Sequence, residues 1–160
     1  MDDRLIVLNL ILQALGEEPN IDGVENRLRL QKVVYLTQIA GVELGYNYSW
    51  YLKGPYSPSL TKDYYELNNL LGNGDKSSDE KKLNDSVLGR LARIREMIAK
   101  PSEFTRESSY WYELLASIHF LSKTSKYDER KVSEVIKNTK PHLSDFIDLG
   151  WSRLRSAGLV

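Results

Sequence analysis

One helical segment, residues 24–40, constrains this fold most because it carries apolar side chains on two separate faces. At 100° per residue, a broad apolar face and a smaller patch lie on either side of a narrow polar stripe that contains Gln31. A helix with two apolar faces needs neighbours on both sides. The sequence therefore predicts a central helix. It also predicts a partly buried, hydrogen-bonded Gln31, since an unpaired buried amide costs about 1–3 kcal/mol. The broad face consists of Leu30, Val33, Val34, Leu36 and Ala40, and the smaller patch of Leu28, Tyr35 and Ile39.

The segment that follows this helix has the alternation of a half-buried β-strand. Residues 48–53 place large apolar side chains on one face and a mixed set on the other. Gly54 and Pro55 then predict a turn, and Ser57 fits the N-cap of a new helix with Pro58 at its first position. The predicted order is strand, tight turn and helix. The first face consists of Tyr48, Trp50 and Leu52, and the second of Ser49, Tyr51 and Lys53.

Periodic apolar residues elsewhere predict further helices joined by polar loops. The length favours one domain over residues 1–160, because domains commonly contain about 100–200 residues. The predicted fold class is therefore mostly α, an α-rich α+β fold with six to seven helices around one short strand region. Besides the two helices above, helices are expected at residues 3–15, 79–100 and 110–124, in a short stretch capped by Asp128, and in a last stretch that begins at His142 or Ser144.

The first of these helices is apolar around nearly its whole circumference. Such a helix is covered on several sides, either by the rest of its own chain or by a partner. Burial within the fold is the favoured explanation in a domain of this size. A homodimer formed through this helix is the alternative.

The composition excludes several classes of catalytic and metal site. The chain has no Cys, which removes disulfides, thiol catalysis and thiolate metal ligands. Its two histidines, His119 and His142, lack the paired spacing of a zinc site, and a surface or satisfied core His is expected at each. No Ser lies in a nucleophile-elbow context, and the Gly72–Gly74 loop lacks the Lys and the preceding strand of a phosphate-binding loop. We therefore expect a non-enzymatic protein with no cofactor and no metal.

The location of the protein is predicted from patterns that the chain lacks. Its start, Met-Asp-Asp, has no basic residues and leads into an apolar run that Asn9 interrupts, unlike a secretory signal. No segment approaches the roughly 20 apolar residues that span a bilayer. Absence of Cys is compatible with a reducing compartment. The expected location is cytoplasmic, with no membrane partner.

A cluster of aromatic residues is the densest unusual feature of the chain. Six of the ten tyrosines lie between Tyr46 and Tyr65. Tyr and Trp recur at protein interfaces, stack on unpaired bases and also fill cores. Tyr48, Trp50 and Tyr64 are expected in the core. The candidate contacts with a partner protein are Tyr51, Lys53 and Tyr56, which lie on the opposite strand face and in the turn.

Basic residues form a second candidate surface between residues 82 and 100. They line one side of the predicted helix 79–100, where they would contact phosphate. The alternative is a solvated helix face, because Asp85 and Glu96 lie nearby and the chain as a whole has 22 basic and 22 acidic residues. Nucleic acid is therefore the less favoured partner. The candidate nucleic-acid contacts are Lys82, Arg90, Arg93 and Lys100.

Two short motifs resemble one protein family. The run from Asn26 to Gln38, with Leu30-Gln31-Lys32 and Tyr35, is similar to the LQKLxYL helix of the Panacea and YwgA-like proteins. The run from Tyr51 to Ser57, with Gly54-Pro55, resembles their YGPYS turn. The segment Glu113–Phe120, the pair Lys140-Pro141 and the closing Gly158-Leu159 resemble the YwgA-like C-terminal half, so the likeness covers most of the chain.

The resemblance implies a small prokaryotic or phage domain with an α-rich, partly winged-helix-like fold. Panacea members include antitoxins and a proteolytic adaptor, which implies a protein partner, either toxin-like or a regulated target. Two features depart from the pattern: Lys53 stands where the family often has an aromatic residue, and residues 72–82 show no wing strand. The leading hypothesis is an antitoxin-like or adaptor-like interaction module. The alternative is a DNA-binding regulator of winged-helix type that uses the helix after Ser57 or the surface around Arg93.

Overall fold

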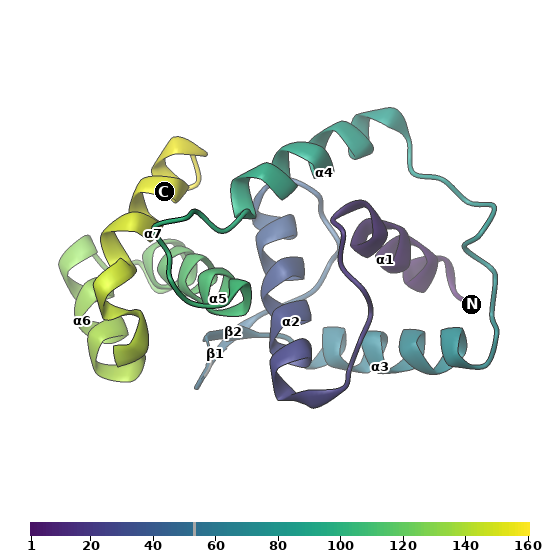
Figure 1. Ribbon diagram of the computed structural model, residues 1–160, viewed down its shortest axis with the longest axis horizontal. Helices are drawn as coiled ribbons and strands as arrows, with labels where there is room; N and C mark the ends of the chain where they lie inside the picture. The colour runs from purple at the N-terminus through teal and green to yellow at the C-terminus, as the bar shows by residue number, and fades with distance from the viewer. Residues whose placement is uncertain (53) are drawn as a thin grey trace.

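The computed structural model of the chain describes residues 1–52 and 54–160. These residues form seven α-helices and one two-stranded antiparallel hairpin at the edge of the molecule, which confirms the predicted mostly α fold class (Figure 1). No helix in the described ranges is both long and apolar enough to cross a membrane. The elements are α1 (Asp3–Ala14), α2 (Gly23–Ile39), β1 (Ser49–Tyr51), β2 (Gly54–Tyr56), α3 (Pro58–Gly72), α4 (Asp85–Ile98), α5 (Ser108–His119), a π-helical turn (Phe120–Thr124), α6 (Glu129–Thr139), a 3₁₀ segment (Pro141–Phe146) and α7 (Ile147–Ser156).

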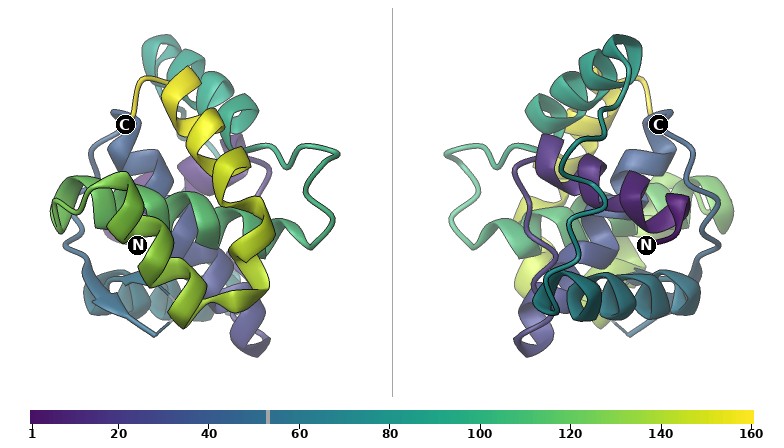
Figure 2. Two further views of the ribbon diagram at one scale, coloured as in Figure 1. Left: turned by 90° about the vertical axis from the view of Figure 1, so that its left-hand side faces the viewer. Right: turned by 90° about the vertical axis from the view of Figure 1, so that its right-hand side faces the viewer.

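Helix α2 lies at the centre of the molecule, as its two apolar faces predicted. In Figure 1 it stands between α1 and α3 on one side and α5, α6 and α7 on the other. The end-on views of Figure 2 show α6 and α7 covering one end of the molecule and α1 and α3 the other. The assignment of residues to the two faces was wrong in detail: Leu30 and Val34 belong to the smaller core with α1 and α3, whereas Val33, Tyr35 and Leu36 belong to the larger core.

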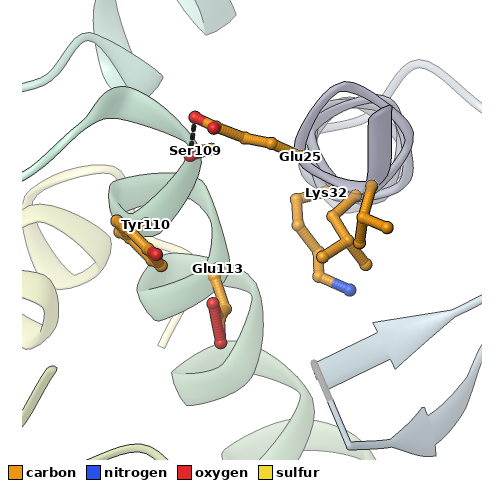
Figure 3. A pocket seen from close by; sticks show the side chains of 7 residues that line it. Glu25, Lys32, Ser109, Tyr110 and Glu113 are labelled. Carbon is orange, nitrogen blue, oxygen red and sulfur yellow. Dashed lines mark hydrogen bonds between the residues drawn. The ribbon is translucent and has the colours of Figure 1, made fainter. Parts of the chain in front are cut away.

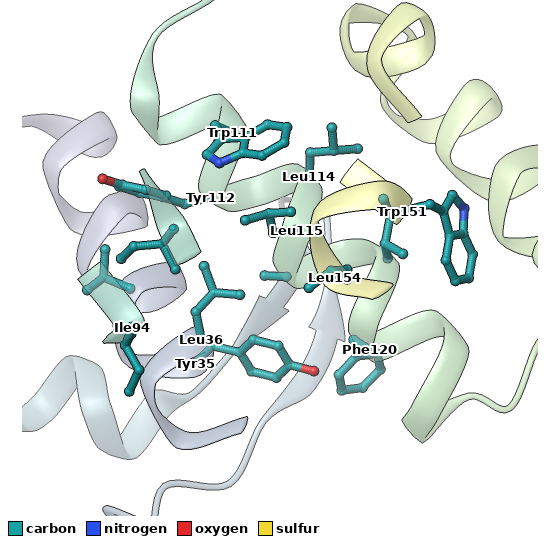
Figure 4. Close-up of a cluster of buried hydrophobic side chains, with 14 of the residues drawn as sticks. Tyr35, Leu36, Ile94, Trp111, Tyr112, Leu114, Leu115, Phe120, Trp151 and Leu154 are labelled. Atoms are coloured by element: carbon teal, nitrogen blue, oxygen red, sulfur yellow. The ribbon is translucent and has the colours of Figure 1, made fainter. Parts of the chain in front are cut away.

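The larger core forms where α5 packs against α2 and α7. Trp111, Leu114 and Leu115 of α5 are fully buried there, and Figure 4 shows them between Leu36 of α2 and Leu154 of α7. Burying large apolar side chains of this kind contributes about 1.5–3 kcal/mol each. This packing fixes the relative position of α2 and α5, the two helices that form the walls of the candidate site below.

The hairpin corrects the predicted strand and turn. Gly54 and Pro55 do not end the strand in a turn; they form β2, which pairs with β1 in the register Trp50 to Pro55. A Pro without an N–H is tolerated in such an edge strand. The chain reverses around Leu52 instead, whose side chain is 92% exposed rather than on a buried strand face. Ser57 is the N-cap of α3 as predicted: its hydroxyl accepts a hydrogen bond from the Leu60 N–H.

Several helix boundaries differ from the predicted ones. Helix α4 begins at Asp85 rather than at residue 79, because the Asn84 side chain caps it by accepting a hydrogen bond from the Val87 N–H. Asp128 caps α6 as predicted, through the Lys131 N–H. The final helix begins later than predicted, since residues 141–146 form a 3₁₀ segment before α7. The strand that a winged helix would have after α3 is absent from the described loop 73–84, and the hairpin precedes α3 instead.

Helix α1 buries most of its apolar surface within the chain. Leu5, Leu8 and Leu12 pack in the smaller core, and Ile11 packs in the larger one. Among the apolar residues of this helix, Val7 is the exception that remains exposed, at 38%. Internal packing therefore accounts for the apolar circumference of α1, and a homodimer formed through it stays a prediction.

Candidate functional site: a buried charge cluster beneath an aromatic hairpin

The two motifs that carried the family resemblance are joined by hydrogen bonds. The Gln31 amide is fully buried, donates to the Ser57 carbonyl at 2.9 Å and accepts from the Ser57 N–H at 2.8 Å. The neighbouring Lys32 donates from its ammonium group to the Pro55 carbonyl. The prediction of a hydrogen-bonded structural Gln31 is confirmed. These bonds attach the hairpin and the start of α3 to α2.

The hairpin can approach Lys32 and Ser117 closely at residue 54 because glycine has no side chain. Its φ is +94°, and a Cβ there would lie 2.9 Å from the Ser117 Oγ and 3.6 Å from the Lys32 Cε. Left-handed backbone costs a residue with a side chain about 1–2 kcal/mol before any clash.

We expect Gly54→Ala to lower the free energy of unfolding by about 2–3 kcal/mol in denaturant titrations, the sum of backbone strain and forced repacking. The matched control is Gly45→Ala, which has a φ of +81° but nothing within 4 Å of its Cβ. Gly45→Ala should therefore lose only the free energy that the left-handed backbone costs. Equal losses for the two variants would show that the space beside Ser117 and Lys32 is not restrictive.

Three buried charged residues meet beneath the hairpin, and they come from distant parts of the chain. Lys32 of α2, Glu113 of α5 and Lys140 after α6 are 1%, 6% and 1% exposed. The Lys140 ammonium donates to the Glu113 carboxylate at 3.0 Å and to the Leu52 carbonyl at 3.0 Å, and it lies 5.5 Å from the centre of the Trp50 ring. We call these three residues the charge cluster.

The environment of the cluster changes the protonation equilibrium of Lys32. Burial lowers the pKa of Lys32 from 10.5 to about 7, because desolvation disfavours the ammonium form. The Glu113 carboxylate opposes this effect and the Lys140 ammonium adds to it. Glu113 is hydrogen-bonded to Lys140, and its second oxygen lies 3.7 Å from the His142 Nε2. Lys32 therefore has a carbonyl rather than a carboxylate as its hydrogen-bond acceptor among the described residues.

Two cavities open beside Lys32, one on either side of Leu28. The first, of about 250 Å³, lies between α2 and α5, and Figure 3 shows Lys32 across it from Tyr110 and Glu113. The second, of about 260 Å³, lies between α2 and the hairpin and is lined almost entirely by apolar groups. The residues around the first are Val24, Glu25, Leu28, Lys32, Ser109, Tyr110 and Glu113; those around the second are Leu28, Lys32, Tyr51, Leu52, Gly54 and Tyr56.

The structure brings two of the three predicted partner contacts together at the second cavity. The Tyr51 and Tyr56 rings pack edge to face with centroids 5.2 Å apart, and Tyr51 is 47% exposed. Lys53 lies outside the described residues. With the exposed Leu52 and the half-buried Leu28, these tyrosines form one apolar patch. We call Leu28, Tyr51, Leu52 and Tyr56 the hairpin surface.

The aromatic residues that were assigned to the core are in fact buried to different degrees. Tyr64 is 1% exposed. Tyr48 and Trp50 are half-buried; Tyr48 packs against both cores and Trp50 against the larger one. His119, the first of the two histidines, is a satisfied core His as expected: its Nδ1 is hydrogen-bonded to the Tyr35 hydroxyl at 2.7 Å, and burial lowers its pKa to about 4.

The four basic residues of the predicted nucleic-acid surface do not form one stripe. Lys82 and Lys100 lie outside α4, and the Lys100 ammonium donates to the Arg106 carbonyl at 2.8 Å. Arg90 donates to the Gly41 carbonyl at 3.1 Å. Arg90 and Arg93 do line one shallow cavity of about 560 Å³ together with apolar residues.

Sequence reasoning missed the charge cluster. It placed Lys32, Gly54 and Pro55 only within motifs, and it gave Glu113 and Lys140 no role beyond the resemblance. One available signal was the position of Lys32 on a helix predicted to be covered on both sides, where a lysine has little access to water.

Two comparisons and one structural property bear on the class of site. No protein-family model matches the chain, and no curated protein gives a significant match. Among residues 1–52 and 54–160, His, Asp and Glu side chains form no group of three that would hold a metal ion. The geometry of the hairpin and the cluster therefore carries the functional argument.

Proposed function

We propose that this protein is a non-enzymatic interaction module that binds a partner protein through the hairpin surface, in the antitoxin-like or adaptor-like manner that the resemblance implies. The observation that carries the proposal is Leu52, a large apolar side chain that is 92% exposed at the tip of the hairpin. Beside it, Tyr51 and Tyr56 offer aromatic area at a low cost in conformational entropy.

Two hydrogen bonds attach the segments that present these side chains to the rest of the fold. Lys32 donates to the carbonyl of Pro55 in β2, and Lys140 donates to the carbonyl of Leu52, the residue after β1. A preorganised surface loses less entropy when it binds, so more of the contact energy appears as affinity. The partner expected here is a protein that inserts an apolar side chain into the cavity between Leu28 and the two tyrosines.

The contacts of the basic residues favour protein over nucleic acid as the partner. Lys100 and Arg90 donate to backbone carbonyls of the chain itself. A phosphate-binding surface instead presents several cations together to the backbone of the nucleic acid. A DNA-binding role would predict affinity that falls steeply with salt concentration.

The test is capture of a partner from the native cell by tagged wild-type protein and by Leu52→Glu, with nuclease treatment of both samples. A charge at the tip of an apolar surface must be desolvated on binding, so we expect Leu52→Glu to weaken the captured complex by about 30-fold, the effect of a hot-spot residue of about 2 kcal/mol. Tyr51→Ala is expected to weaken it in the same direction. Affinities are then measured by calorimetry with the purified partner.

Matched controls come from other exposed apolar residues. Leu88 of α4 is 41% exposed and Tyr127 is 40% exposed, and neither lines the cavity at the hairpin. Leu88→Glu and Tyr127→Ala should bind the partner like the wild type. A partner that binds Leu52→Glu and Tyr51→Ala with unchanged affinity would refute the hairpin surface, and a complex lost on nuclease treatment would favour nucleic acid.

A further inference from the structure

The cavity between α2 and α5 is lined by one buried amino group, that of Lys32, which forms no ion pair with any of the residues that the structure describes. Lys32 lines this cavity, and its ammonium donates to the Pro55 carbonyl as its one hydrogen-bond acceptor among the described residues. An ammonium group has three donors, so two of them have no acceptor here. The nearby carboxylate of Glu113 is paired with Lys140 at 3.0 Å.

The number of charged groups in the cluster also indicates an excess of positive charge. The cluster contains two amino groups and one carboxylate, all at most 6% exposed. A buried charge is stable when an opposite charge and hydrogen bonds compensate it. When Lys32 is protonated, the cluster has one positive charge in excess, because its one carboxylate, Glu113, is already hydrogen-bonded to Lys140. Glu25, at the rim, is exposed and accepts a hydrogen bond from Ser109 at 3.1 Å.

We propose that this cavity binds a small monocarboxylate, whose carboxylate lies beside the Lys32 ammonium and whose apolar part contacts Val24, Leu28 and the Tyr110 ring. The volume, about 250 Å³, is below the roughly 300–1,000 Å³ of sites for drug-sized ligands, so the ligand is small. A single negative charge fits better than two, because Glu25 and Glu113 also line the cavity and repel further negative charge.

This inference stands apart from the proposed function. It concerns a different cavity: Leu28 and Lys32 line both cavities, but the carboxylate site involves neither Tyr51 nor Leu52. The variant Leu52→Glu, which is expected to weaken partner binding about 30-fold, should therefore bind carboxylates like the wild type. Failure of one proposal is in this way distinguishable from failure of the other.

The test uses monocarboxylates from acetate to hexanoate, with benzoate and 3-phenylpropanoate, each compared with its primary amide. Binding to the full chain is followed by NMR shifts of backbone amides around Lys32 and quantified by calorimetry. At pH 6.5, we expect at least one carboxylate to bind tenfold or more tightly than its uncharged amide. Equal affinity for every acid and its amide, or no binding by any acid at 10 mM, would overturn the proposal.

The pH dependence gives a second readout. The groups that face Lys32 are Glu113 and Tyr110 from α5, Glu25 from α2, and Lys140 with His142 from the segment after α6. Because burial lowers the pKa of Lys32 to about 7, raising the pH from 6.5 to 8.5 removes its charge and should weaken carboxylate binding about 20-fold. Amide binding should not change. A carboxylate affinity that is constant over this range would contradict the role of Lys32.

Two variants locate the site. Lys32→Met should abolish the preference for carboxylates, whereas Lys82→Met, at an exposed lysine outside the cavity, should leave it unchanged. Val24 is 60% exposed at the rim, so Val24→Trp should fill the cavity and block binding without disturbing the hydrogen bonds of Lys32. The second variant tests the site even if Lys32→Met does not fold, and unchanged carboxylate binding by Val24→Trp would overturn the assignment.

Discussion

Glu113→Gln is expected to lower the free energy of unfolding by about 3–5 kcal/mol at pH 7, the usual result of removing one partner of a buried ion pair. Glu113 is 6% exposed and Lys140 is 1% exposed, so water cannot replace the lost carboxylate. The Lys140 ammonium would stay buried near Lys32 with its negative partner removed. Chemical denaturation monitored by tryptophan fluorescence measures the loss.

The chain offers a matched control in a second carboxylate pair. Glu129 accepts a hydrogen bond from Arg155 at 2.6 Å, but the two side chains are 55% and 52% exposed. Glu129→Gln should cost less than about 1 kcal/mol, because exposed ion pairs contribute little. If Glu113→Gln were no more destabilising than Glu129→Gln, the cluster would not be a dry, charged site.

A double variant distinguishes the loss of the Glu113–Lys140 attraction from the cost of leaving the Lys140 charge buried. In Glu113→Gln with Lys140→Met both members of the Glu113–Lys140 pair are replaced by neutral side chains, a change that often regains stability. We expect the double variant to be more stable than Glu113→Gln alone. Additive losses would indicate that the two side chains contribute independently.

Local patterns in the sequence predicted the parts of the site that depend on neighbouring residues. The Ser57 cap was predictable because an N-cap is decided by atoms within three residues. The central position of α2 followed from its two apolar faces, and Gln31 followed from its place in the polar stripe between them. The turn was misplaced because Gly54 and Pro55 favour turns locally, whereas here β2 is held by contacts with Lys32 and Ser117, far away in the chain.

The charge cluster was not predictable in the same way. Lys32, Glu113 and Lys140 lie on three separate elements and meet only after α5 packs against α2. Lysine and glutamate in helices are usually exposed, so each residue alone favoured a solvated face. Packing of the larger core, rather than any local motif, removes these three side chains from water. The pattern of residues in a single sequence does not indicate such a long-range contact.

The cluster also makes the stability of the protein depend on pH above pH 7. Burial lowers the pKa of Lys32 from 10.5 to about 7, so between these values the unfolded chain binds a proton at Lys32 that the folded chain does not. Stability contributed by this residue therefore rises as the pH increases from 7 towards 10.5, and the folded state carries the full penalty below pH 7. The whole span corresponds to about 5 kcal/mol, since each unit of pKa is worth about 1.4 kcal/mol.

Part of this span can be measured before tyrosines titrate. Comparing the wild type with Lys32→Met cancels the titration of other groups, and the difference in unfolding free energy should shift by about 2 kcal/mol in favour of the wild type between pH 7 and pH 9. The exposed control Lys82→Met should show a constant difference. If Lys32→Met does not fold, ¹⁵N NMR of the Lys32 Nζ in the wild type replaces the comparison, with a midpoint near 7 expected. A midpoint near 10 would mean that the ammonium is solvated or already paired, and the argument for an anion beside it would fail as well.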